Sequence, residues 1–321
     1  MKSLDVANID VVGGSSALDE RLSADGYLFF RGVLDKSSIA LVRDAYVAAL
    51  RRRQLLGLDS DKHWTGNRPS DYKSRLNELH NDRIWERFVA SPQINSLLTK
   101  ILGDEPWWIP VSEYRAVLPV EDLGNRDIRL YAHQDSYFTG KLGFRTLWIP
   151  LCEIDDRMGG LALAPGMHNR GLLHDIAKPP SYNIPSDAVP QSAWRGGPYS
   201  PGDLVMFHQD MPHSGLVNQS DGIRMSMDLR CQRKSDPHPI VGTLTGLNQN
   251  ELAIQLNSAE IVQLAVDETT YFWNFDGGPR LTPAEAAAVM PPGCEVVAER
   301  HGAVASVVRL NSSERARRIF Q

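Results

Sequence analysis

The sequence predicts a mainly β domain, a sandwich or a barrel, whose first hundred residues supply a helical cover. Helical periodicity is confined to the beginning of the chain, and short strand-like runs follow from Pro106 onward. Glycine, proline, asparagine and aspartate separate these runs. Short strands at close, regular spacing are typical of β sandwiches and barrels rather than of alternating βαβ units.

The first hundred residues contain the expected helices. Residues 25–35 (DGYLFFRGVLD) form a short apolar and aromatic run that predicts a strand. From Ile39 to Leu55, apolar residues recur at three- and four-residue steps, which is the period of an amphipathic helix. Ser37 and Ser38 can cap the start of this helix.

A second helical stretch spans residues 82–102 and stops at Gly103. We expect two helices here, because proline is costly inside a helix. Ser91 as N-cap, followed by Pro92 as the first helical residue, starts the second one.

Strand-like runs fill the middle of the chain. They cover residues 107–118, 128–138, 144–154, 159–168, 202–208, 213–217 and 223–232. We expect a single domain over residues 1–321, with a helix-rich part (about 1–105), a β core (about 106–235) and a C-terminal extension (about 236–321). Residues 170–200 are rich in proline and glycine, and a loop of that length is usually functional or mobile. Whether it is a lid stays open.

The C-terminal extension has two helix signals, at Thr282-Pro283 and at residues 312–320. Its role stays open between capping the barrel, closing over a substrate and forming a dimer contact.

Composition limits the function classes. The chain is 42% hydrophobic and 23% charged, with a formal net charge of −5 and no basic footprint for nucleic acid. Its three cysteines are far apart and show no CxxC spacing, so we expect neither a disulfide framework nor a zinc knuckle. The N-terminal residues do not resemble a signal peptide, and no stretch reaches the roughly 18 apolar residues of a membrane span. We therefore expect a cytoplasmic protein.

His133 and Asp135 lie two residues apart in a strand-like run, so both side chains should project from the same face. One imidazole and one carboxylate can bind one metal ion. A histidine from a distant strand would complete the 2-His-1-carboxylate triad, which leaves three positions open on iron(II) for a bidentate 2-oxo acid and dioxygen. By itself the pair is a weak signal, because this spacing often occurs by chance.

The same tripeptide recurs at His208-Gln-Asp210, so a second observation has to choose between the candidates. That observation is an arginine, because a dicarboxylate co-substrate needs a guanidinium at its remote carboxylate. Arg224 lies eleven residues after His213, whereas the same step from His208 reaches Gln219. The spacing selects His213 as the distal ligand.

Arg224 opens a regular alternation of polar and apolar residues. The polar positions are Arg224, Ser226, Asp228 and Arg230, and the apolar positions are Ile223, Met225, Met227, Leu229 and Cys231. A surface strand with its polar face in water is one interpretation. In a barrel covered by helices, the apolar set would pack under the helices and the polar set would line the interior. The N-terminal helices supply such a cover.

Five motifs follow one another along the chain. They are residues 25–35, the His133/Asp135 pair, Leu147–Leu151 leading into Gly159–His168, Gly202–Phe207 before His213, and Arg224–Ser226. In this order they resemble the phytanoyl-CoA dioxygenase family of iron(II)/2-oxoglutarate oxygenases. The resemblance implies a double-stranded β-helix (jelly-roll) core, with His133, Asp135 and His213 as iron ligands. It also implies that Arg224, with help from Ser226, binds 2-oxoglutarate.

The reaction implied by this resemblance uses iron(II), 2-oxoglutarate and O2, and releases succinate and carbon dioxide. Its substrate would be a small molecule or secondary metabolite that is hydroxylated or otherwise oxidised. Asp135 favours hydroxylation, desaturation or ring formation, because related halogenases have Ala or Gly at that position. The chain has Pro165-Gly-Met-His168 where such proteins often have PGSH, and we expect His168 to be structural. Nothing resembles the family beyond about residue 232.

Aromatic and basic residues near the proposed metal are candidates for the substrate pocket. They are Tyr131, Tyr137, Phe138, Arg145, Trp148 and Arg230. Tyr137 and Phe138 follow Asp135 closely, so at least one should face the site, and Arg145 or Arg230 can meet an anionic group. The substrate stays open, although the lack of a basic cluster argues against a coenzyme A thioester.

The alternative function is a non-catalytic cupin-like barrel that binds a ligand, or a zinc site built from the same three residues. An intact Arg224 argues against it. A nucleic-acid demethylase of the same chemistry would need a basic surface, which the composition does not provide. We expect a small-molecule substrate, no nucleic-acid or membrane partner, and an oligomeric state that the sequence leaves open, including a homodimer.

Overall fold

The computed structural model describes residues 1–7, 14–70, 72, 76, 78–120, 132–139, 143–174, 184–273 and 281–310. The chain divides into two compact units. The first comprises most of residues 1–235. The second comprises the described part of residues 236–310, together with Asp135–Thr139, Gly143–Phe144 and His174. We describe each unit by itself, and the single domain expected over residues 1–321 stays a prediction.

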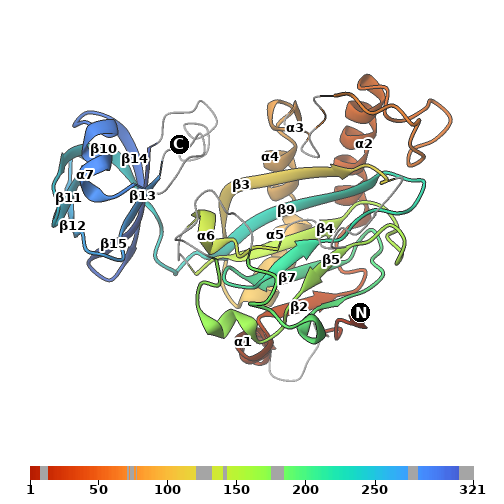
Figure 1. The fold of residues 1–321 in the computed structure, drawn as a ribbon, viewed down its shortest axis with the longest axis horizontal. Coiled ribbons are helices and arrows are strands. Elements are labelled where there is room, and N and C mark those ends of the chain that lie inside the picture. Colours follow the sequence, from red (N-terminus) through yellow and green to blue (C-terminus); the bar gives the residue numbers. More distant parts are fainter. Residues whose placement is uncertain are drawn as a thin grey trace. The chain divides into compact units, whose positions relative to one another are not determined.

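The first unit is built on a five-stranded antiparallel sheet in the order β2-β7-β4-β9-β3 (Figure 1). The strands are β2 (Tyr27–Phe30), β3 (Pro106–Val117), β4 (Arg145–Pro150), β7 (Leu204–His208) and β9 (Arg224–Arg233). Strand β9 pairs with β3 on one side and β4 on the other, and its residues 224–232 are all buried. Strand β9, which the alternation of polar and apolar residues predicted, is therefore an inner strand of the sheet.

A second, four-stranded sheet completes the core in the order β1-β6-β5-β8. Its strands are β1 (Lys2–Ser3), β5 (Leu161–Leu163), β6 (Arg195–Gly196) and β8 (His213–Gly215). Side chains of the two sheets meet, since the ring centroid of Phe207 on β7 lies 4.7 Å from that of His213 on β8. These two sheets confirm the expected mainly β fold with a double-stranded β-helix core.

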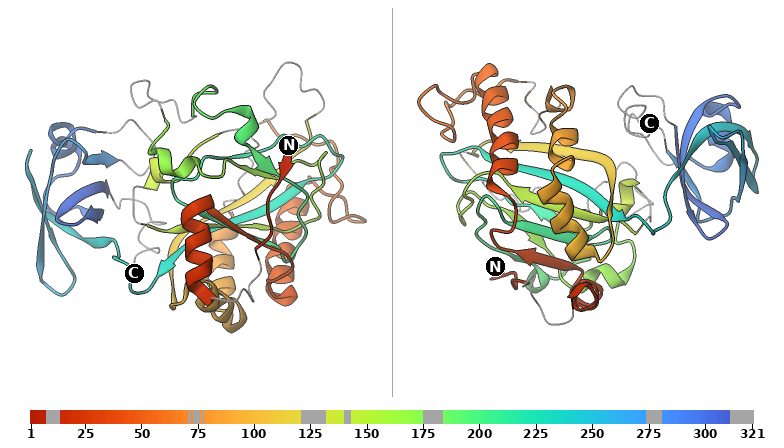
Figure 2. Two further views of the ribbon diagram at one scale, coloured as in Figure 1. Left: turned by 90° about the horizontal axis from the view of Figure 1, so that it is seen from below. Right: turned by 180° about the vertical axis from the view of Figure 1, so that it is seen from behind.

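Helices cover one face of the five-stranded sheet (Figures 1 and 2). They are α1 (Gly14–Asp25), α2 (Lys36–Arg52), α3 (Glu78–Asn81), α4 (Ile84–Val89) and α5 (Pro92–Leu102). Tyr46 of α2 donates its hydroxyl to the carbonyl of Ser226 at 2.5 Å, and the indole N–H of Trp108 donates to Asn95 of α5 at 2.9 Å. The apolar face of β9 thus packs under helices, and its polar face is turned toward the interior.

The helix limits differ slightly from those expected. Asp35 is the N-cap of α2, and its carboxylate accepts from the backbone N–H of Ser38 at 2.9 Å, so the assignment of Ser37 or Ser38 as the cap is wrong. The Ser37 hydroxyl also donates to this carboxylate. Hydrogen bonds from Ser37 and Ser38 lower the pKa of Asp35, and the one from the Ser37 hydroxyl contributes most. An aspartate outcompetes serine here because its carboxylate also favours the positive end of the helix dipole.

The expected division of residues 82–102 into two helices is confirmed. Ser91 is the N-cap of α5 and its hydroxyl accepts from the backbone N–H of Ile94, with Pro92 in the first turn. Gly103 ends the helix with φ of 70°.

Replacing Ser91 with alanine should lower the free energy of unfolding by about 1 kcal/mol, because the first turn of α5 loses its cap. Denaturant unfolding measures this change. The control is Ser96→Ala, which removes a hydroxyl within the same helix and should leave stability unchanged or slightly raised. Equal losses in the two variants would contradict a capping role.

Residues 236–310 form a separate β structure. Its strands are β10 (Ile240–Leu247), β11 (Glu251–Gln255), β12 (Ile261–Ala265), β13 (Tyr271–Trp273), β14 (Glu295–His301) and β15 (Val304–Leu310), with helix α7 at Pro283–Val289. Strands β10, β11 and β12 form an antiparallel meander, β14 returns to pair with β10, and β15 pairs with both β14 and, in parallel, β12. This closes a small barrel with the Greek-key strand order of OB folds.

The barrel has its own apolar core. Leu252, Ile254, Phe272, Val296 and Val308 are among its fully buried members. The helix expected at Thr282-Pro283 is confirmed as α7, whose Thr282 and Glu285 form a capping box. The helix expected at residues 312–320 lies outside the described residues.

Residues 170–200, expected as a long loop, contain short regular elements in their described part. Within residues 184–200 the structure has a short 3-10 helix, Gln191–Ala193, and strand β6, whereas residues 175–183 are not described. Another 3-10 helix spans Met167–Arg170. All three cysteines are free. Among the described residues, no helix has the length and apolar character needed to cross a membrane.

Candidate metal centre

Three side chains with metal-binding atoms converge in the structure. The ligand atoms of His133, Asp135 and His213 all lie within 4.8 Å of one another, and they form the only group of three or more such residues found among the described residues. His213 and Asp135 are buried, and His133 is half-buried. Two imidazoles and one carboxylate at this separation can bind one ion from one side and leave its other positions open.

Backbone pairing places the two histidines. His133 and His213 form an antiparallel bridge, in which each backbone N–H donates to the other residue's carbonyl at 2.9 Å. The centroids of their rings lie 4.1 Å apart. His213 Nδ1 lies 2.9 Å from the carbonyl of Met211, and a proton on Nδ1 makes this contact a hydrogen bond and leaves Nε2 as the metal-binding atom.

The local structure of the His133/Asp135 pair differs from the expected strand. His133 forms only an isolated bridge, and Asp135 lies in a turn before the short helix α6 (Ser136–Thr139). A turn can nevertheless place the carboxylate beside the imidazoles, so the pair converges for a different reason from the one that the sequence suggested.

Gln134, between the two expected ligands, holds the segment in place. Its amide nitrogen donates to the carbonyls of Gly171 and Asp210, both at 2.8 Å, and its amide oxygen accepts from the backbone N–H of Leu173 at 2.7 Å. The side chain is fully buried. Apart from the position of Gln134 between His133 and Asp135, no signal in the sequence pointed to this role.

The second tripeptide, His208-Gln-Asp210, makes contacts away from the three converging ligands. His208 Nδ1 accepts from the backbone N–H of Asp210 at 3.1 Å, and its ring centroid lies 5.3 Å from that of His168. His168 Nε2 lies 3.0 Å from the carbonyl of Ser23. Neither His208 nor Asp210 joins the group of possible ligands among the described residues, which agrees with the choice of His213.

Arg224 is a buried cation anchored to backbone. It is 4% exposed, and its Nη1 donates to the carbonyls of Gly159, Gly160 (3.5 Å) and Leu216 (2.6 Å). Burial lowers its pKa to about 10, so the guanidinium is still charged at neutral pH. Gly215 permits this close packing, because a Cβ there would lie 3.0 Å from Nη2.

Arg224 also has a buried donor without a partner in the described part of the chain. Its Nε is buried and has no hydrogen-bond partner among the described residues. An unsatisfied buried donor on a cation is costly, and a carboxylate is the group that a guanidinium edge binds best. The residue therefore fits the remote carboxylate of a 2-oxo dicarboxylate. Ser226, two residues along the same face, is also buried.

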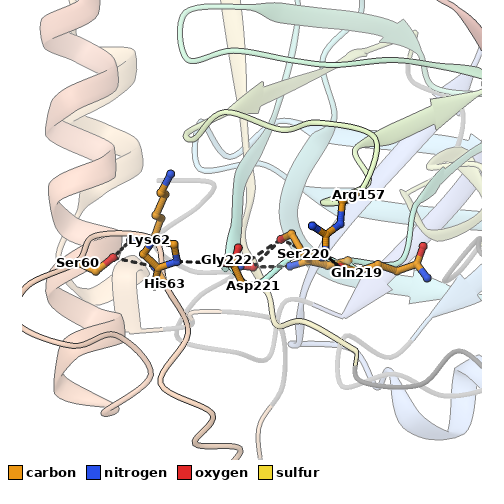
Figure 3. A network of polar contacts seen from close by, with 9 residues as sticks. Ser60, Lys62, His63, Arg157, Gln219, Ser220, Asp221 and Gly222 are labelled. Carbon is orange, nitrogen blue, oxygen red and sulfur yellow. Dashed lines mark hydrogen bonds and ion pairs between the residues drawn. The ribbon is translucent and has the colours of Figure 1, made fainter.

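A polar network holds the turn that leads into β9 (Figure 3). The backbone N–H of Ile223 donates to the carbonyl of Lys62 at 2.8 Å, and His63 Nδ1 lies 3.4 Å from the carboxylate of Asp221. On the other side, Arg157 donates to the carbonyl of Gln219 at 3.2 Å. These contacts fix the start of β9 and hence the position of Arg224.

The expected substrate residues fall into different places. Arg230 pairs with Thr146 on β4, which pairs with Phe207 on β7, so these three share the face on which Phe207 contacts His213. Arg145 pairs with Cys231 and belongs to the opposite face. Of the two arginines, Arg230 is the one on the interior face. Phe207 is a site residue that the sequence did not single out, although its strand precedes His213.

The aromatic candidates are also separated. Tyr137 is 8% exposed and its ring stacks on that of His174, with 4.0 Å between the centroids. Trp148 shares the interior face, where its ring centroid lies 4.7 Å from that of Tyr199. Tyr131 and the side chain of Phe138 lie outside the described residues. The substrate roles of all six candidates stay predictions.

Comparisons with known proteins extend these observations. A family model described as phytanoyl-CoA dioxygenase (PhyH) matches residues 22–226. Two proteins called 1-deoxypentalenic acid 11-beta-hydroxylase are each 27% identical, that of Streptomyces arenae over 233 residues and that of Streptomyces exfoliatus over 237. Each alignment covers 68% of this chain and 81% of the relative.

Solved structures match at lower identity. EvdMO1 has a TM-score of 0.50 at 19% identity, with 68% of this chain and 50% of that chain covered. AviO1 from Streptomyces viridochromogenes Tue57 has a TM-score of 0.49 at 19% identity, with 73% of this chain and 99% of that chain covered.

Proposed function

The chain belongs to the phytanoyl-CoA dioxygenase family, and from this premise we propose that it hydroxylates a small-molecule secondary metabolite at an iron(II) held by His133, Asp135 and His213. It is an oxidoreductase of the 2-oxoglutarate-dependent dioxygenase class, and its cofactors are iron(II), 2-oxoglutarate and O2. The observation that carries the residue assignment is the convergence of the three ligand atoms within 4.8 Å.

When bound, iron(II) and 2-oxoglutarate supply the activation of dioxygen for the oxidation, with release of succinate and carbon dioxide. The protein's own residues supply geometry. The bridge between His133 and His213 fixes both imidazoles, and Met211 orients the His213 ring. Asp135 occupies the third ligand position, and the family resemblance then favours hydroxylation, desaturation or ring formation over halogenation.

Arg224 would bind the remote carboxylate of 2-oxoglutarate through its unused Nε edge, with Ser226 contributing its hydroxyl. Three backbone carbonyls already hold the guanidinium in place, so it loses little freedom when the co-substrate binds. The anion would also offset the cost of keeping this cation buried. Both effects favour a dicarboxylate over a 2-oxo acid that has a single carboxylate.

The substrate would carry an apolar skeleton and an anionic group. Arg230 is 6% exposed on the interior face, and Phe207 and Trp148 give that face an aromatic surface. The two relatives are named for a carboxylic acid, which fits an arginine in this position.

Free thiols at Cys152, Cys231 and Cys294 support the cytoplasmic location that we propose.

The C-terminal barrel does not favour a nucleic-acid substrate. OB-type barrels that bind nucleic acid present basic grooves with aromatic side chains. Residues 236–310 contain nine aspartates and glutamates, three arginines and no lysine. Their strand order therefore does not imply nucleic-acid binding.

Anaerobic titration tests the reaction class. Iron(II) and 2-oxoglutarate together should give the weak visible charge-transfer band that is typical of this chelate in the family, whereas either one alone should not. Aerobic turnover against a metabolite panel should then produce succinate, and 1-deoxypentalenic acid and its methyl ester belong in that panel. If the enzyme binds its substrate through a carboxylate, the acid should react faster than the methyl ester.

Two outcomes would contradict the proposal. If no band appears and no succinate forms, the chain is not acting as an oxygenase, and the non-catalytic barrel is favoured. Tight binding of zinc without any response to 2-oxoglutarate would favour a zinc site built from the same residues.

A further inference from the structure

The short helix α6 directly follows Asp135 and depends on tertiary contacts. It has only four residues, Ser136–Thr139, and a helix of this length is not stable alone. Carbonyls near the end of a helix lack partners within it, so most carbonyls of this short helix depend on water or on groups outside it. Whatever holds these carbonyls also fixes the position of Asp135 at the start of the segment.

Tyr271 supplies such a contact from β13. Its hydroxyl donates to the carbonyls of Tyr137 at 3.3 Å and Ser136 at 3.4 Å. One hydrogen is shared between two acceptors, and both belong to the first half of α6. All three residues belong to the same compact unit of the structure.

Tyr271 itself is fixed by the barrel. It pairs with Val307 of β15, and the neighbouring Thr270 donates its hydroxyl to the carbonyl of Ala305 at 2.6 Å. Thr270 is buried, and its hydroxyl oxygen also accepts from the backbone N–H of Asp267 at 3.1 Å. The pairing with Val307 places Tyr271 on a strand of the barrel, whereas the Thr270 hydroxyl supports the barrel through separate bonds to Ala305 and Asp267.

A side chain of α6 is held as well. Tyr137 stacks on His174 with the two rings nearly parallel, at 11°. Tyr137 and His174 are both buried. Backbone carbonyls and an aromatic ring of the same four-residue helix are thus engaged by two separate contacts.

We propose that Tyr271 is a positioning residue of the oxygenase, through which the C-terminal barrel fixes α6 and, with it, the carboxylate of Asp135. This inference rests on the proposed function. The family match ends at residue 226, so the barrel lies outside the part of the chain that defines the family. Tyr271, α6 and Asp135 all belong to the second compact unit, so the barrel would act on the expected carboxylate ligand within that unit.

Tyr271→Phe removes only the hydroxyl and tests this role. In the metal-free full chain, hydrogen exchange of the α6 amides should become faster by on the order of threefold to tenfold, as expected for losing one neutral hydrogen bond. Iron(II) affinity, measured by anaerobic titration, should fall by a similar factor. With substrate, succinate formation should exceed product formation more than it does in the parent enzyme.

Thr270→Val is the matched control. It removes the adjacent buried hydroxyl and its bond to Ala305 within the barrel, but it leaves the contact with α6 in place. Thermal unfolding shows how far each variant destabilises the chain. The control should lower the melting temperature without changing α6 exchange or iron(II) affinity.

Two results would overturn the inference. In the first, Tyr271→Phe has the same α6 hydrogen-exchange rate and the same iron(II) affinity as the parent protein. In the second, Thr270→Val changes both quantities as much as Tyr271→Phe does, which would show that barrel stability alone is responsible. If the parent protein binds no iron(II) and gives no band with 2-oxoglutarate, the proposed function fails instead, while the exchange measurement still reports on the contact.

Discussion

Replacing His213 with alanine should weaken iron(II) binding by more than about 100-fold and abolish turnover. Loss of a supporting hydrogen bond around a metal site already costs roughly 10–100-fold in affinity, and loss of a ligand costs more. The two remaining side chains, His133 and Asp135, would leave the ion weakly held. Anaerobic titration with iron(II), followed by succinate assay at saturating metal, measures both effects.

His208 offers a control of the same chemistry. It belongs to the tripeptide that repeats the sequence of the expected ligand pair, and its imidazole accepts a hydrogen bond from the backbone of Asp210. His208→Ala should lower thermal stability somewhat, yet leave iron(II) affinity within about twofold of the parent. If His208→Ala abolishes binding and His213→Ala does not, the ligand assignment is wrong.

Replacing Arg224 with alanine should raise the KM for 2-oxoglutarate by roughly 100-fold or more. Hydrogen bonds to charged groups contribute about 1.5–3 kcal/mol each, and a guanidinium can make two to one carboxylate. Arg224→Lys keeps the charge but loses the planar fork, so its KM should lie between those of the parent and the alanine variant. Steady-state succinate assays at varied 2-oxoglutarate give these values.

A second co-substrate separates binding from loss of structure. Arg224 also holds the carbonyls of Gly159, Gly160 and Leu216, so its replacement loosens the turn around it. 2-Oxopentanoate lacks the remote carboxylate and should be a poor co-substrate for the parent enzyme. The alanine variant should discriminate little between the two acids. A variant that still strongly prefers 2-oxoglutarate would show that another residue binds this carboxylate.

Local sequence signals were sufficient for much of the first unit. The proline at residue 92 and the serine before it predicted the break between α4 and α5, because both act within a few residues of the break. The alternation along β9 predicted a strand with two different faces. It did not decide whether the polar face meets water or the interior. The ring contact of Tyr46 on α2 with Tyr114, which pairs with Met227 of β9, decides this by placing α2 on the apolar face.

The barrel of residues 236–310 was not predicted. Its strands are short, and alternation was present in β11, where Leu252 and Ile254 are buried between more exposed neighbours. Five residues of alternation are a weak signal when turns lie on both sides. The closing pairs of β14 with β10 and β15 with β12 join segments far apart in the sequence, so no local pattern specifies them.

The sequence by itself determined the chemical identities and the spacing at the proposed metal site. Residues two apart in His133-Gln-Asp135, and an arginine eleven residues after His213, are properties of the chain that need no structure. Only the tertiary structure decided how they meet. Asp135 lies in a turn rather than a strand, and His133 meets His213 through a backbone bridge between distant segments. The reason is physical: spacing along a chain constrains near neighbours, whereas convergence of distant ligands depends on sheet pairing and on buried contacts such as those of Gln134.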